Sequence, residues 1–268
     1  MAVSGKKRRT RRPPRNLSGR KKTGMPADQA LTRLVLLRHG QSIWNHEGRF
    51  TGWSDVALSA RGEAEAKKAG SVLKQCGFTF DVCFTSELKR AQHTLSLIQS
   101  VIQLNHLPVY QDWRLNERHY GALEGLRRLE AIWQFGIWPI LDCQLCFDAT
   151  PPLLTTEDPR APANQMRYAS IDRTRLPLAE SLSQTLHRVQ PLWHDKILPE
   201  IRQGKRLLIV SHKNLLRTLV MQLDGLTPSQ AMRLPFATGK PLCYELNAQL
   251  KPVRRYYLDS SAESAGII

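Results

Sequence analysis

Short apolar segments alternate with longer amphipathic segments along most of the chain. Buried strands are predicted from apolar content at residues 33–37, 81–85 and 206–210, with weaker candidates at 108–111, 242–246 and 253–257. Helices are predicted from the spacing of apolar positions over about 60–75, 87–104, 126–135, 180–203 and 214–223. Strands that alternate with helices predict an α/β fold, here a three-layer α/β/α sandwich around a mainly parallel sheet.

Capping and breaking residues refine these predictions. Ser59 is suited to cap the helix over 60–75, and Thr227-Pro228 is suited to start a further short helix. Pro191 is expected to kink or interrupt the segment 180–203, because proline removes a backbone donor and clashes with the preceding turn. Residues 148–178 are rich in proline and polar side chains, so a long surface loop is expected there.

Two of the buried strands lead into a histidine. The apolar run 34–37 continues into Arg38 and His39, and the run 206–210 is followed by Ser211 and His212. Since parallel strands share one carboxyl edge, where open α/β sheets bind ligands, both histidines are expected at that edge. A neutral imidazole can attack phosphorus near pH 7, because its ordinary pKa is about 6.5. A capping role would explain one such histidine, but two are harder to explain in that way.

Length and charge limit the class of protein. The 268 residues suit one large domain or two small ones, and no apolar run approaches the length of about 18 residues needed for a membrane span. The formal net charge is +16, but residues 1–27 hold ten Lys/Arg and no Asp/Glu. The remaining 29 basic and 23 acidic side chains leave a net charge of +6 for the rest. We therefore divide the chain into a basic, disordered N-terminal extension over 1–27 and a folded domain over 28–268.

The extension has three interpretations. It could be a nucleic-acid-binding arm, an organelle-targeting peptide, or an extension without function, and we favour the last. It has no apolar stretch typical of a secretory signal, and the five scattered cysteines indicate a reducing compartment, so a cytoplasmic protein is expected. Cys143 and Cys146 form a lone C-x-x-C without a second Cys/His pair, which makes a poor zinc site. No metal is expected.

Four segments occur in an order that is typical of one superfamily. They are R-H-G-x-S-x-x-N from Arg38 followed by T-G-W-x-D from Thr51, S-x-L-x-R-A-x-x-T from Ser86, N-E-R-H-Y-G-A-L from Asn116, and S-H at Ser211. The set resembles the histidine phosphatase superfamily and, more narrowly, the cofactor-dependent phosphoglycerate mutases. The likeness runs from about 34 to 257. The domain over 28–268 is thus expected to be phosphoglycerate mutase-like and catalytic, with a lid and loop region over about 126–178.

The resemblance implies a role for each matched residue. His39 is expected to attack the phosphoryl group and become phosphohistidine, which splits one transfer into two easier ones. Arg38, Arg90 and His212 would hold the phosphoryl oxygens. Glu117 would act as general acid and base for the substrate hydroxyl. The expected substrate-binding residues are Asn45, Thr51, Gly52, Arg90, Glu117, Arg118, His119, Tyr120, Arg128, Lys213 and Asn214.

The same resemblance implies a reaction. A phosphorylated isomerase would convert 3-phosphoglycerate into 2-phosphoglycerate in glycolysis and gluconeogenesis, through enzyme-bound 2,3-bisphosphoglycerate, which also primes the enzyme. Arg118 and Tyr120 would bind the carboxylate and second phosphate. The family needs no metal and is often dimeric or tetrameric, so a homo-oligomer without membrane association is expected. Two alternatives stay open: a phosphatase on the same scaffold, and a non-catalytic member that acts through a partner.

Three features depart from the family pattern. Lys213 follows His212 where the family has glycine, and it would either block phosphate binding or assist it by reaching an anion. The family's arginine pair falls on Gln144-Leu145, and its lysine on the preceding helix falls on Arg128. Residues 131–147 are apolar where the family is polar. This segment fits either an exposed partner surface, with an altered pocket, or a lid that is better buried.

Overall fold

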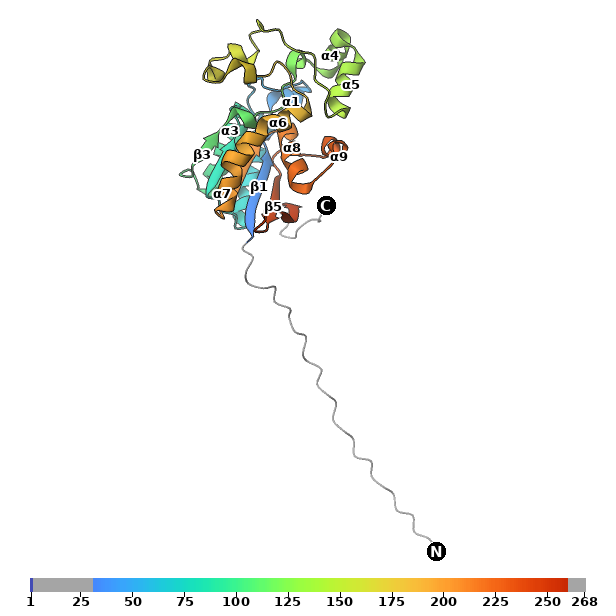
Figure 1. The fold of residues 1–268 in the computed structure, drawn as a ribbon. Helices are drawn as coiled ribbons and strands as arrows, with labels where there is room; N and C mark the ends of the chain where they lie inside the picture. Colours follow the sequence, from blue (N-terminus) through green and yellow to red (C-terminus); the bar gives the residue numbers. More distant parts are fainter. Residues whose placement is uncertain (2–30, 260–268) are drawn as a thin grey trace.

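A mixed six-stranded sheet forms the middle layer of the fold (Figure 1). The computed structural model describes Met1 and residues 31–259, so the extension predicted over 1–27 lies, Met1 apart, outside the described residues. The sheet order is β3-β2-β4-β1-β5-β6. The strands are β1 (Thr32–Arg38), β2 (Val82–Thr85), β3 (Val109–Gln111), β4 (Leu207–Ser211), β5 (Pro241–Leu246) and β6 (Pro252–Tyr257). Strand β4 runs parallel to β1 and β2, and β2 runs parallel to β3, whereas β5 is antiparallel to β1 and β6. The expected mainly parallel sheet is confirmed.

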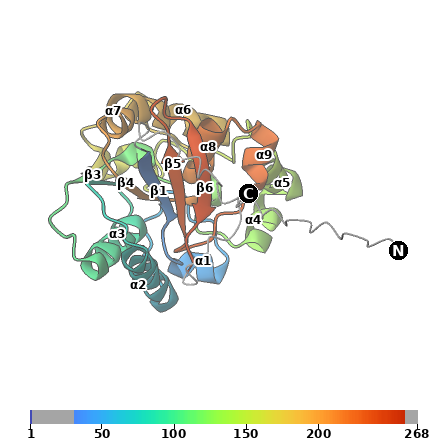
Figure 2. The ribbon, with the colours of Figure 1, turned by 90° about the horizontal axis from the view of Figure 1, so that it is seen from below.

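Helices cover both faces of the sheet, which explains why its central strands are continuously apolar. Along β1, Leu34 and Leu36 face one core cluster, and Val35 and Leu37 face the other. The first cluster includes side chains of α6 (Leu182–Leu192), α7 (Leu198–Arg202) and α8 (Lys213–Asp224). The second includes side chains of α2 (Ala60–Gln75) and α3 (Lys89–Ile102). Figure 2 shows the two helical layers on either side of the strands, which confirms the three-layer sandwich.

The segment predicted as one interrupted helix over 180–203 is helical from Leu182 to Arg202. Helix α6 continues through a π-helical turn (Trp193–Ile197) into α7. Pro191 lies inside α6. The expected interruption is the π turn that follows this proline. The short helix predicted after Thr227 is α9 (Pro228–Arg233), in which the Thr227 side chain accepts a hydrogen bond from the backbone of Gln230.

The loop predicted over 148–178 is more regular than its composition suggests. It contains three short 3₁₀ turns, at Pro162–Asn164, Met166–Tyr168 and Arg173–Arg175. Tyr168 is buried, and its ring centroid lies 5.2 Å from that of Trp53. Burial of an aromatic side chain fixes a turn that the polar sequence around it would not fix alone.

The apolar segment 131–147 folds as a helical hairpin of α4 (Arg128–Phe135) and α5 (Ile137–Leu145). Helix α5 was not predicted. Its Pro139 lies in the first turn, where backbone donors lack intrahelical partners and proline is tolerated. The segment is neither wholly exposed nor wholly buried. Ala131, Ile140 and Cys143 are buried, whereas Trp133 and Trp138 are 91% and 71% exposed. Within the described residues, no helix is long and apolar enough to cross a bilayer.

Candidate active site

The register of the sheet brings the two strand-end histidines together. Arg38 pairs with Ser211 between the parallel strands β1 and β4, so His39 and His212 leave the sheet at the same edge. Their ring centroids are 4.9 Å apart, and both side chains are buried. The backbone N–H of His39 donates to the carbonyl of Ser211 over 2.9 Å, which fixes the two strand ends to each other.

Local contacts leave the Nε2 atom of His39 with the lone pair of the ring. Nδ1 lies 2.6 Å from the carbonyl oxygen of Gly40 and must donate to it, since a carbonyl only accepts. Nε2 then carries the lone pair, 3.3 Å from Nε of Arg90. Burial, followed by the charges of Arg90 and Arg38, holds the pKa of His39 well below its ordinary value. The imidazole is therefore neutral and nucleophilic at physiological pH.

His212 offers a hydrogen-bond donor beside His39. Its Nε2 lies 2.7 Å from Oγ of Ser86, which also accepts from the backbone of Leu88. When the serine hydroxyl donates its hydrogen to Nε2, the imidazole hydrogen lies on Nδ1. Nδ1 is buried and has no partner among the described residues. Burial and nearby cations, Arg90 first, lower the pKa of His212 well below its usual value. Sequence reasoning missed Ser86 as the residue that orients this ring, although its position in the second motif was a signal.

Arg90 is clamped by backbone carbonyls. Its Nη2 donates to Gly52 over 2.6 Å and its Nη1 to Ser54 over 2.8 Å, while Nε points at His39. The side chain is buried, and desolvation lowers the pKa of Arg90 to about 10. Arg38 donates through Nη1 to the carbonyl of Phe236, and its buried Nε has no partner within the described part of the chain. Both guanidinium groups thus line the same cavity as His39, with donor capacity for an anion.

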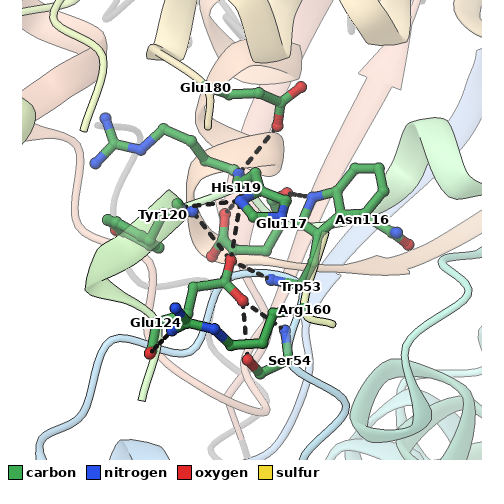
Figure 3. Close-up of polar contacts among 12 residues, drawn as sticks. Trp53, Ser54, Asn116, Glu117, His119, Tyr120, Glu124, Arg160 and Glu180 are labelled. Atoms are coloured by element: carbon green, nitrogen blue, oxygen red, sulfur yellow. Dashed lines mark hydrogen bonds and ion pairs between the residues drawn. The ribbon is translucent and has the colours of Figure 1, made fainter. Parts of the chain in front are cut away.

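A buried carboxylate, Glu124, holds the loop that orients Arg90 (Figure 3). Its Oε1 accepts from the backbone of Trp53 over 2.9 Å and of Tyr120 over 3.1 Å. Its Oε2 accepts from the backbone and hydroxyl of Ser54 over 3.0 and 2.8 Å. Sequence reasoning gave Glu124 no role; its one signal was an acidic side chain directly after the third motif. Glu124 ties two active-site segments, 51–54 and 117–120, to each other.

Glu117 faces the same edge of the sheet from the segment before Gly121. Its Oε1 accepts from the backbone N–H groups of Arg118 over 2.9 Å and Asn214 over 3.1 Å. The amide of Asn214 donates in turn to the hydroxyl of Tyr120 over 3.0 Å. The first turn of α8 is therefore fixed against the segment that carries Glu117.

A cavity of about 190 Å³ collects most of the sequence-predicted residues. It is lined by Arg38, His39, Asn45, Arg49, Phe50, Thr51, Gly52, Arg90, Glu117, Tyr120, Lys213 and Asn214. Arg49 and Phe50 were missed, although they directly precede Thr51. A larger hollow of about 680 Å³ around Trp193, Asp224 and Leu250 lies at the far end of α8 and carries no candidate nucleophile.

Several predicted residues lie outside the lining of the cavity. His212 packs against the His39 ring, and Arg118 is buried with its guanidinium carbon 4.7 Å from the Tyr120 ring centroid. His119 is fully buried, 3.3 Å from Glu124, and accepts at Nδ1 from the backbone of Gly121 (Figure 3). Arg128 is exposed at the start of α4. Of these, His119 and Arg128 are placed to support structure or surface rather than to line the cavity.

Only one of these departures from the family pattern, Lys213, lines the cavity; Gln144 and Leu145 do not. Lys213 is the first residue of α8 and lines the cavity, without the left-handed backbone that would strain a side chain. Gln144 and Leu145 lie at the end of α5 and do not line it, and Leu145 is 70% exposed.

Comparisons with known proteins agree on one superfamily. A family model described as "Histidine phosphatase superfamily (branch 1)" matches residues 34–152 and 153–257. The chain is 68% identical over 226 residues to the 2,3-bisphosphoglycerate-dependent phosphoglycerate mutase 1 of Nitrosomonas europaea, covering 84% of this chain and 97% of that protein. It is 47% identical over 233 residues to the 2,3-bisphosphoglycerate-dependent phosphoglycerate mutase of Hamiltonella defensa, with coverage of 87% and 94%.

Solved structures share the fold at lower sequence identity. The alpha-ribazole phosphatase of Shigella flexneri superimposes with a TM-score of 0.60 at 25% identity, covering 83% of this chain and 94% of that one. A mycobacterial glucosyl-3-phosphoglycerate phosphatase gives a TM-score of 0.63 at 21% identity, with coverage of 87% and 100%. The latter likeness bears on the fold alone.

Proposed function

The chain belongs to the histidine phosphatase superfamily and, within it, to the 2,3-bisphosphoglycerate-dependent phosphoglycerate mutases, and from this premise we propose how it interconverts 3-phosphoglycerate and 2-phosphoglycerate. The observation that carries the proposal is the buried, neutral His39, whose Nε2 lone pair lies beside Arg90 in a cavity that Arg38 also lines. Such an imidazole is suited to carry a phosphoryl group between two oxygens of a glycerate.

In the proposed step, Nε2 of His39 attacks phosphorus and the bond from phosphorus to the glycerate oxygen breaks. Glu117 gives a proton to the leaving oxygen in one direction and takes it back from the attacking hydroxyl in the other. The guanidinium groups of Arg38 and Arg90, with Nδ1 of His212, offset the charge on the phosphoryl oxygens. In a turnover the reverse of this step comes first: phosphorylated His39 gives its phosphoryl group to the free hydroxyl of 3-phosphoglycerate and the phosphorus–nitrogen bond breaks. Nε2 then takes the other phosphoryl group from the bound bisphosphate, which leaves 2-phosphoglycerate.

The residues around the cavity fit 2,3-bisphosphoglycerate. Arg38, Arg90 and Lys213 line it, and Nε of Arg38 and two nitrogens of the buried Arg118 have no hydrogen-bond partner among the described residues. Buried donors and cations of this kind favour a ligand with several negative charges. When bound, 2,3-bisphosphoglycerate supplies the phosphoryl group that primes His39. We infer that Asn45, Thr51, Gly52, Tyr120, Lys213 and Asn214 contact the ligand.

A phosphatase is the second candidate. The observation that favours it is the uncharged pair Gln144-Leu145, which supplies no cation over the cavity. A substrate that is held less firmly would leave phosphohistidine open to water. The mutase remains the better-supported function, because relatives named as mutases share 47% and 68% of their residues with this chain.

A coupled assay separates the two functions. Formation of 2-phosphoglycerate from 3-phosphoglycerate is followed through enolase, with and without 2,3-bisphosphoglycerate, and released phosphate is measured in parallel. We expect isomerisation that depends on the bisphosphate, little free phosphate, and neither product with His39→Ala. Release of phosphate without isomerisation would assign the chain to the phosphatases instead.

We further propose that the protein acts in the cytoplasm as a homo-oligomer, a dimer or a tetramer. The proposal rests on the family and on cysteines that suit a reducing compartment. Light scattering coupled to size-exclusion chromatography tests the oligomeric state, and a monomer at micromolar concentration would contradict it.

A further inference from the structure

Lys213 brings an unpaired ammonium group to the catalytic cavity. The residue follows His212 directly, is half-buried, and lines the cavity together with Glu117 and Tyr120. No hydrogen bond or ion pair of its ammonium group is found within residues 31–259. The ammonium group of Lys213 is therefore available to a ligand.

Three arginines and one carboxylate, Glu117, act on the charge of this lysine. Burial, and then repulsion from Arg217 and Arg38, lowers the pKa of Lys213, while Glu117 acts in the opposite direction. Arg118 is 2% exposed, and its Nε and Nη1 have no hydrogen-bond partner in the part of the chain that the structure describes. Buried donors without a partner favour a ligand that accepts hydrogen bonds from them. This side of the cavity is thus built for an anionic group.

The backbone that carries Lys213 is held in place. The N–H of Asn214 donates to Glu117, and the Asn214 amide donates to the Tyr120 hydroxyl. Leu216 donates through its N–H to the carbonyl of His212 over 2.9 Å, which closes the first turn of α8. The lysine stem is therefore anchored beside the groups that handle phosphorus, while its ammonium group is distinct from the guanidinium pair Arg38 and Arg90.

We propose that Lys213 binds the second anionic group of the substrate, a carboxylate or phosphate remote from the phosphorus under attack. The lysine thereby selects phosphoesters that carry a second anion over those that carry a single phosphate. This inference rests on the proposed function and names a specificity-determining residue for it. Gln144 and Leu145 neither line the cavity nor carry charge, so Lys213 supplies a cation that the lid hairpin does not.

Two ligands that differ in one group provide the test. The probes are 3-phosphoglycerate and glycerol 3-phosphate, which has a hydroxymethyl group in place of the carboxylate, and binding is measured by isothermal titration calorimetry. Lys213→Met is expected to weaken 3-phosphoglycerate about tenfold, the size of one charge-assisted contact, and glycerol 3-phosphate less than about twofold. Lys213→Gly should give the same result, and Lys213→Arg should keep most of the preference.

The matched control is Lys68→Met, which removes an exposed lysine of α2 and should change neither affinity. Equal weakening of both ligands, or an unchanged ratio of the two affinities, would overturn the inference. Retained binding of glycerol 3-phosphate shows that the variant is folded. Binding is measured without turnover, so the two proposals can fail separately. A protein that fails the mutase assay would contradict the proposed function. If Lys213→Met still loses the preference for 3-phosphoglycerate in that protein, the role of Lys213 stands.

Discussion

Burial decides the charge of the side chains at the centre of the cavity. His39 and His212 are both held neutral by desolvation and by the neighbouring Arg90, which keeps a lone pair on one ring and a free donor on the other. The same arrangement makes the folded state less stable when either histidine accepts a proton. The active site therefore makes the stability of the protein sensitive to acid.

Stability should fall as the pH falls below about 6.5. The pKa values of His39 and His212 are depressed in the folded state, so the unfolded chain binds more protons in the range between the folded and unfolded pKa values. Each histidine then lowers the free energy of unfolding by up to about 1.4 kcal/mol for each pH unit. Urea unfolding between pH 5 and 7.5 measures how the free energy of unfolding depends on pH. The double variant His39→Gln/His212→Gln should show a weaker dependence. His194→Gln, at an exposed position, is the control, and an equally steep double variant would contradict the account.

Glu124 should act on catalysis through Arg90. Glu124→Ala removes acceptors for Trp53, Ser54 and Tyr120, so the loop that orients Arg90 loosens. We expect a loss of about 2–4 kcal/mol in the free energy of unfolding and a fall of about tenfold to a hundredfold in the rate of phosphohistidine formation. Rapid quench with 2,3-bisphosphoglycerate measures that rate. Glu63→Gln, in the first turn of α2, serves as control, and an unaltered rate in Glu124→Ala would show that the loop holds Arg90 without the carboxylate.

Individual elements were predictable where local pattern and tertiary packing agree. Strands β1 and β4 are apolar on both faces because helices cover both, and helix α2 has its cap at Ser59. Helix α5 was missed because its stability comes from packing of Ile140 and Cys143 in the α4–α5 hairpin, which no local signal reports. The motif residues of the cavity were predictable from their order. The supporting group Glu124 was not, because its four acceptor contacts are set by tertiary structure.

The first turn of helix α2 packs closely on the segment that follows β1, and Gly62 has no room for a side chain at this contact. A Cβ atom on Gly62 would lie 2.0 Å from the carbonyl oxygen of Gln41, and one on Gly40 would lie 2.1 Å from the carbonyl oxygen of Gly62. Gly62→Ala would ordinarily favour a helix, but here we expect a net loss of about 1–3 kcal/mol from overpacking. Thermal and urea unfolding measure it, with Ala64→Ser on the exposed face as control. If Gly62→Ala were more stable than the original protein, the first turn of α2 would have moved away from residues 40–41 without loss of stability, which would contradict the prediction.

Across the fold, the cavity that we propose as the active site lies at the carboxyl edge of the sheet, and the likeness to known mutases spans most of the chain. The basic residues 1–27 precede the matched region. Deleting them should leave the kcat and KM for 3-phosphoglycerate within about twofold of the full chain, since no residue of the cavity is removed. Steady-state kinetics of the two proteins, compared at low and physiological salt, checks this, and a marked loss of activity would give the extension a catalytic role.

The central claim is that His39 carries the phosphoryl group between glycerate molecules. Rapid quench with radiolabelled 2,3-bisphosphoglycerate, followed by a chase with unlabelled 3-phosphoglycerate, tests it most directly. We predict an acid-labile label on His39, absent from His39→Ala, that moves onto phosphoglycerate during the chase. An unlabelled His39, or label that leaves only as inorganic phosphate, would contradict the account.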